Sequence, residues 1–198
     1  LPLIGDGNGA VRDKLFRARE NRVRPFKDTK VLADWNGLMI AALASVFRLT
    51  GVAEYLRAAD GAADFVLERM RAPDGRLLHV HAGGEARIPA FLDDYAFLIK
   101  GLIALYEAAF DPGRLETALS LTGQAIELFG DEGDGGFFFA ADPEVGSRRK
   151  EVYDGAVPSG NSVMLMNLLR LGRLTGRQEF EGRASSLATA LSVEVSLH

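Results

Sequence analysis

The sequence predicts an all-α fold in which helical hairpins form part of an α/α toroid. Three stretches are apolar around most of their circumference, and each is followed after a short turn by an amphipathic stretch of helical length. An apolar helix joined in this way to an amphipathic one is typical of an antiparallel hairpin whose first helix is the more buried. Because the hairpins recur at intervals of roughly 60 residues, we expect the buried helices to form an inner ring and the amphipathic helices an outer ring.

Each hairpin has its own turn signal. The second and most apolar stretch, FLDDYAFLIKGLIALYEAAF, ends at Asp111-Pro112-Gly113, and the first and third end at Gly51 and Gly176. A charged surface helix precedes the first hairpin. The expected helices occupy residues 11–21, 38–49, 53–70, 91–110, 114–129, 163–171 and 177–195.

The connections between hairpins are much longer than the turns within them. Residues 71–90 contain two turn signals around an alternating segment, which predicts a short β-hairpin, and residues 130–158 form a second, mixed connection. Because short turns and long connections alternate along the chain, the long connections all lie at the end where the buried helices begin. We therefore expect the N-termini of the buried helices to share one rim with these connections.

Composition limits the possible functions. A chain of 198 residues that is 47% hydrophobic can bury one substantial core, and its formal charge of -4 is spread without a basic patch for nucleic acid. No apolar stretch is long enough to cross a membrane. The chain has no cysteine, which excludes disulfides within it and agrees with a reducing, cytoplasmic compartment. No motif for a cofactor is present and no cluster has metal-ligand spacing, so we expect neither a cofactor nor a metal.

Five segments of the sequence form a recognisable set. They are KVLADWNGLMIAALA, FLDDYAFLIKGLIALYEA, GGFFF, RRKEVYDGAVPSGNSV and LLRL, which begin at Lys30, Phe91, Gly135, Arg148 and Leu168. Together they resemble one protein family, the spermatogenesis-associated, thioredoxin-fused proteins. The resemblance implies a six-hairpin toroid similar to those of α/α-barrel glycosidases and N-acylglucosamine 2-epimerases. It covers only the later part of that toroid, without the thioredoxin-like domain. Residues 1–198 are therefore expected to be a partial toroid domain whose open flanks are covered by missing hairpins or another subunit.

Carboxylates at the rim are the candidate catalytic residues. Asp93 and Asp94 are adjacent, so on a helix they point about 100° apart, and we expect one to cap the helix and the other to face the centre of the ring. Asp34 and Asp154 are the other two rim carboxylates. In a glycosidase, two of these four would act together, roughly 6.5 to 9.5 Å apart for inversion or nearer 5 Å for retention.

Other polar and aromatic residues of the rim are candidates for substrate binding. Aromatic rings stack on the apolar faces of sugars, amides donate and accept hydrogen bonds, and an arginine could lower the pKa of a rim carboxylate. The alternatives are core packing for the aromatic rings, helix capping for the serine and the amides, and a solvated position for the arginine. The set comprises Trp35, Asn36, Tyr95, Ser159, Asn161 and Arg148.

The two internal histidines lie in the predicted β-hairpin. His79 and His81 share one face of its first strand, and the favoured interpretation is that both are exposed strand residues rather than general bases.

Two functions remain open from sequence alone. The first is binding or processing of a small-molecule ligand, a carbohydrate, by carboxylate acid/base chemistry. The second is a non-catalytic scaffold or recognition module for a fused thioredoxin-like domain. Two rim carboxylates facing an open cleft would favour chemistry, whereas carboxylates fully bonded to backbone N–H groups would favour the scaffold.

Overall fold

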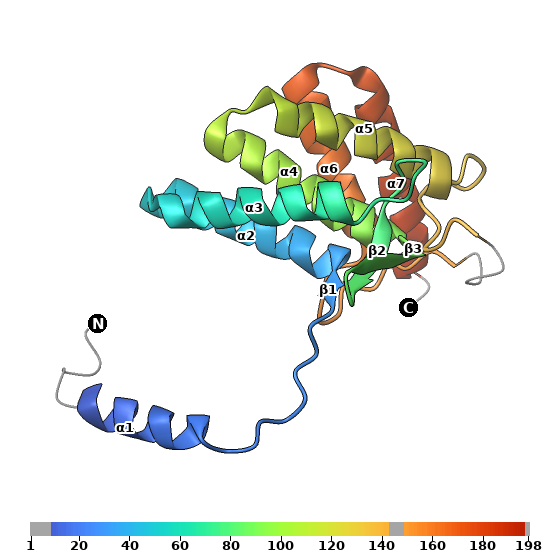
Figure 1. Cartoon of the computed structure of the whole chain (residues 1–198). Helices are drawn as coiled ribbons and strands as arrows, with labels where there is room; N and C mark the ends of the chain where they lie inside the picture. Colours follow the sequence, from blue (N-terminus) through green and yellow to red (C-terminus); the bar gives the residue numbers. More distant parts are fainter. Residues whose placement is uncertain (1–8, 143–148, 197–198) are drawn as a thin grey trace.

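The computed structural model describes residues 9–142 and 149–196. Within them, six helices form three antiparallel hairpins, and a small sheet lies at one end (Figure 1). The predicted all-α toroidal architecture is confirmed. No helix in these two ranges is both long and apolar enough to span a bilayer.

An additional helix, α1 (Gly9–Glu20), precedes the hairpins and lies away from them on an extended arm (Figure 1). None of its residues is buried. The predicted charged surface helix is thus present.

The inner helices are α2 (Ala33–Thr50), α4 (Leu92–Ala109) and α6 (Gly160–Thr175). Helix α4 packs between the other two, and most of its side chains are buried, as its almost uninterrupted apolar sequence predicts. The returning helices are α3 (Ala53–Arg69), α5 (Pro112–Phe129) and α7 (Gln178–Ser196), each packed on its own partner.

Two glycines let α2 and α4 approach closely. A Cβ at Gly37 would lie 2.4 Å from the carbonyl carbon of Phe97, and one at Gly101 would lie 2.9 Å from the carbonyl oxygen of Gly37. Both contacts are with backbone atoms, which cannot move aside as a flexible side chain can. The spacing of these two inner helices therefore depends on glycine at both positions.

The sheet is antiparallel, with the order β1-β2-β3. Strands β2 (Leu78–Ala82) and β3 (Glu85–Pro89) form the predicted hairpin, and Gly83 and Gly84 turn the chain with φ of 62° and 88°. The two-residue strand β1 (Val31–Leu32) was not predicted. It joins β2 directly before α2 begins, and so fixes the start of α2 beside the sheet.

At the opposite end of the inner helices, Glu107 of α4 links all three. One of its carboxylate oxygens lies 2.9 Å from a guanidinium nitrogen of Arg48 in α2, and the other lies 2.9 Å from a guanidinium nitrogen of Arg170 in α6. The three-helix wall is thus connected by ion pairs at the end that lies away from the sheet.

Candidate functional site

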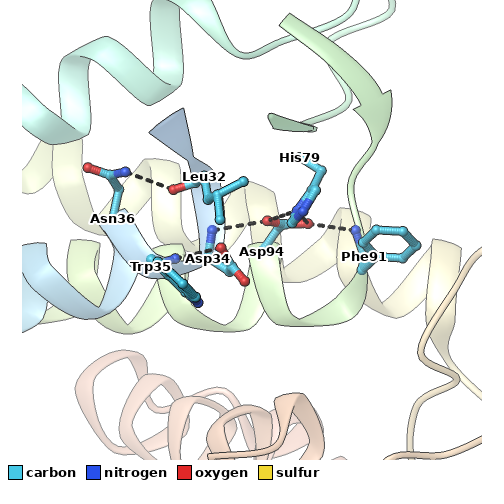
Figure 2. Close-up of polar contacts among 7 residues, drawn as sticks. All are labelled: Leu32, Asp34, Trp35, Asn36, His79, Phe91 and Asp94. Carbon is cyan, nitrogen blue, oxygen red and sulfur yellow. Dashed lines mark hydrogen bonds and ion pairs between the residues drawn. The ribbon is translucent and has the colours of Figure 1, made fainter. Parts of the chain in front are cut away.

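Asp94 lies where α2, α4 and β2 meet (Figure 2). It is completely buried, and its carboxylate accepts hydrogen bonds from the backbone N–H of Asp34 (3.0 Å) and of Phe91 (2.8 Å). The Phe91 bond is the capping-box bond of α4, with Asp94 at the third helical position. Asp94 is therefore the capping carboxylate of the adjacent pair, and its bond to Asp34 confirms that α2 and α4 begin at the same rim.

Asp93 is the member of the pair that does not cap the helix. It is half-buried, and its Oδ1 is buried without a hydrogen-bond partner in the described part of the chain. This oxygen faces the start of α6, where a Cβ at Gly160 would lie 2.4 Å from it. The third inner helix thus begins at the same rim.

The pKa of Asp93 is raised to about 6. Burial is the main cause, because it disfavours the charged form, and the negative charges of Asp94, Asp34 and Glu151 raise it further. The backbone N–H of Gly160 offsets only part of this. Asp93 can therefore hold or release a proton near neutral pH.

Asp34 is a second half-buried rim carboxylate. Burial is the main cause of its raised pKa, and repulsion from Asp94 adds to it. Its Oδ1 accepts a hydrogen bond of 2.7 Å from the backbone N–H of Trp35. The Trp35 side chain is 62% exposed, so its ring is available to a ligand at this rim.

The structure corrects the interpretation of the histidines. The Nδ1 of His79 lies 2.9 and 3.0 Å from the two carboxylate oxygens of Asp94, and its side chain is only 23% exposed. The hydrogen bond to Asp94 is the main cause of the raised pKa of His79. His81 is also half-buried, with its ring 5.1 Å from that of Phe65. Neither is an exposed strand residue.

His79 also completes a cluster that linear spacing did not reveal. Single ligand atoms from Asp34, His79 and Asp94 all lie within 4.8 Å of one another, close enough to hold a metal ion. However, Asp94 already accepts bonds from the other two residues and from Phe91, so a cation would have to displace them. The donor atoms fit a hydrogen-bonded pair of histidine and carboxylate better than a metal site.

The predicted rim residues of α6 all bond to backbone or to each other. Ser159 is the N-cap of α6 and accepts a hydrogen bond from Ser162, while the exposed Asp154 accepts one from the backbone N–H of Ser159. Asn161 is buried, accepts a bond from the N–H of Phe137 and donates to the carbonyls of Phe137 and Glu151. Asn161 thus fastens the long connection to the start of α6.

The remaining predicted binding residues have different positions. Tyr95 is only 1% exposed, and its hydroxyl accepts a bond from the N–H of Leu77, so its ring belongs to the core rather than to a pocket mouth. Asn36 is half-buried and donates to the carbonyl of Leu32 (Figure 2). Arg148 lies outside the described residues.

Comparison with known proteins identifies homologous segments. The chain is 39% identical over 193 residues to spermatogenesis-associated protein 20 of Homo sapiens, and 32% identical over 189 residues to the uncharacterized protein B0495.5 of Caenorhabditis elegans. These matches cover 91% and 90% of this chain but 24% and 26% of the relatives. The chain therefore spans about a quarter of the length of the curated relatives it matches. No protein-family model matches the sequence.

Solved structures share the fold at low sequence identity. The GH76 α-mannanase BT2949 of Bacteroides thetaiotaomicron aligns with 93% of this chain and 55% of its own, with a TM-score of 0.70 and 18% identity. Cellobiose 2-epimerase of Spirochaeta thermophila aligns with 80% of this chain and 42% of its own, with a TM-score of 0.63 and 17% identity. The α/α toroid of glycosidases and epimerases is thus the architecture of this chain.

Proposed function

We propose that this chain carries part of a site that processes a saccharide by acid/base chemistry, with Asp93 and Asp34 as the reacting carboxylates. The proposal also places the chain in the family of thioredoxin-fused relatives that its sequence resembles. Enzymes named as sugar epimerases, isomerases and glycoside hydrolases share the toroid. A shared fold does not establish a reaction, so the proposal depends on the rim residues.

The state of Asp93 is the observation that carries the proposal. A half-buried carboxyl group with a buried oxygen that lacks a partner among the described residues is unfavourable for folding, and a single substitution at this position would remove that cost. A pKa of about 6 suits a group that gives and takes a proton near neutral pH. Perturbed carboxyl groups of this kind cluster at functional sites.

The neighbouring residues have distinct roles in this proposal. Protonated Asp93 donates its proton to a glycosidic or carbonyl oxygen, and ionised Asp34 acts as the second carboxylate, as a base or a nucleophile. Asp94 is a positioning residue, because its oxygens already bond to Asp34, Phe91 and His79. The exposed ring of Trp35 stacks on the sugar.

The test is a titration with mono- and disaccharides, followed by the fluorescence of Trp35, the only tryptophan. A binding sugar should change the emission, and Asp93→Asn should keep binding but lower turnover of that sugar by about 10²–10⁴-fold. Asp13→Asn, on the exposed helix α1, is the matched control and should change neither. No response to any sugar, together with an ordinary pKa for Asp93 by carboxyl NMR, would refute the proposal.

A scaffold function is the second candidate, because several predicted site residues have structural roles. Asp94, Asp154 and Asn161 all bond to backbone groups that shape the rim. Under this alternative the chain supports a fused thioredoxin-like domain, and rim substitutions lower stability without affecting any sugar. Asp93 distinguishes the two functions, because its Oδ1 is buried without a partner in the described chain and the backbone N–H of Gly160 offsets only part of the effect of burial on its carboxyl group.

A further inference from the structure

A cavity of about 320 Å³ lies between α4 and α6. Near the rim it is lined by Asp154 and Ser162, and farther along the helices by Met166 and Arg170 of α6 and Lys100 of α4. Lys100 follows Asp93 by two helical turns, which is about 10 Å along α4. A disaccharide can span this separation from the proposed acid.

Among the described residues that line this cavity, Lys100 supplies the one unpaired positive charge. Arg170 is already bound to Glu107 at 2.9 Å. The ammonium of Lys100 makes no ion pair or hydrogen bond with any residue in the described ranges, although the residue is half-buried. Asp154, the negative group of the lining, is exposed and accepts a bond from the N–H of Ser159. A ligand with one negative charge can therefore pair with Lys100 without displacing an existing partner.

Asn167 adds an unused acceptor to the same lining. It is 1% exposed, and its Nδ2 donates to the carbonyl of Ala96 at 2.8 Å, while its Oδ1 is buried with no partner among the described residues. Buried polar atoms are nearly always bonded, so an orphaned acceptor beside a cavity points to a donor from a ligand. The Met166 side chain, 56% exposed, offers an apolar surface next to it.

From these residues we propose that the cavity is a subsite for a uronate unit of an acidic saccharide. The Lys100 ammonium pairs with the uronate carboxylate, a sugar hydroxyl donates to Asn167, and Met166 contacts the apolar face of the ring. One ammonium matches a singly charged carboxylate better than a phosphate dianion. The inference deepens the proposed function and rests on it, because it names the class of saccharide that would reach Asp93.

The test is calorimetric titration of the chain with glucuronate, glucose and glucose 6-phosphate. Glucuronate should bind at least tenfold more tightly than glucose, a difference of about 1.4 kcal/mol. Lys100→Met keeps the aliphatic stem and should abolish this preference, whereas Lys14→Met on the exposed helix α1 should preserve it. Equal binding of glucuronate and glucose, or an unchanged preference in Lys100→Met, would overturn the subsite. Tighter binding of the phosphate would overturn its assignment to uronates.

Two further measurements keep the test decisive. If Lys100→Met does not fold, the salt dependence of the unsubstituted chain replaces it. Raising the salt from about 50 to about 500 mM should weaken glucuronate binding but not glucose binding, and an equal response would overturn the inference. Asp93→Asn should keep the preference for glucuronate. If the unsubstituted chain shows the preference for glucuronate but turns over no saccharide, the proposed reaction alone is contradicted. Absence of binding by every sugar would overturn the subsite.

Discussion

Replacing Asp93 by asparagine should stabilise the protein at neutral pH. Folding raises the pKa of this carboxyl group from 3.8 to about 6, so between these values the folded chain binds the proton more tightly than the unfolded chain. The contribution of Asp93 to stability is therefore fully present below about pH 4 and is lost as the pH rises through about 6. Asparagine carries no charge at any of these pH values, so the variant does not lose this contribution to stability as the pH rises.

The magnitude follows from the size of the shift. About two pKa units at 1.36 kcal/mol each give an upper limit of about 3 kcal/mol. Because the side chain is only half-buried, solvent screening reduces this, and we expect about 1–2 kcal/mol. The stability of Asp93→Asn relative to the unsubstituted chain should therefore rise by about 1–2 kcal/mol between pH 4 and pH 7.5.

Equilibrium unfolding in urea at a series of pH values measures this difference directly. Asp13→Asn, on the exposed helix α1, is the control and should show no comparable trend. If Asp93→Asn has the same relative stability at pH 4 and pH 7.5, the carboxyl group is not perturbed, and the argument for its role as an acid fails.

Two further substitutions test the packing and the histidine pair. Gly37→Ala would place a Cβ 2.4 Å from the backbone of Phe97, and it should lower the free energy of unfolding in urea by about 1–3 kcal/mol. Gly61→Ala is the control, because its Cβ would have nothing within 4 Å, and it should be neutral or stabilising by up to about 1 kcal/mol. Equal effects would contradict the close helix contact. His79→Gln removes the interaction with Asp94 that raises the pKa of the imidazole. The loss of stability in this variant, relative to the unsubstituted chain, should therefore be larger at pH 5.5 than at pH 9. A loss that does not depend on pH would show that the pair contributes no charge-dependent stability.

The helices and their pairing into hairpins could be predicted because their signals are local. Apolar periodicity, glycine stops and the turn at Asp111-Pro112-Gly113 act within a few residues of the chain. The sequence also predicted that the N-termini of the inner helices share one rim, because short and long connections alternate along the chain. The resemblance to spermatogenesis-associated proteins is supported by homologous segments, but fusion to a thioredoxin-like domain stays a prediction.

The individual roles at the rim could not be predicted, because they depend on contacts between distant residues. Asp34 and Asp94 are 60 positions apart, and the bond between them forms only because close packing brings the starts of α2 and α4 together. Nothing in the sequence around His79 showed that its ring would meet Asp94. For Tyr95 the sequence left core packing and ligand binding open for a similar reason, since its core position depends on where the chain around Leu77 passes.

Asp94 joins α2 to α4 near the sheet, and Glu107 joins all three inner helices at the far end. A wall fixed in this way keeps its curvature when the loops above it change. None of the residues that form these links belongs to the two long connections, so substitutions at exposed positions of those connections are expected to leave the spacing of the inner helices unchanged.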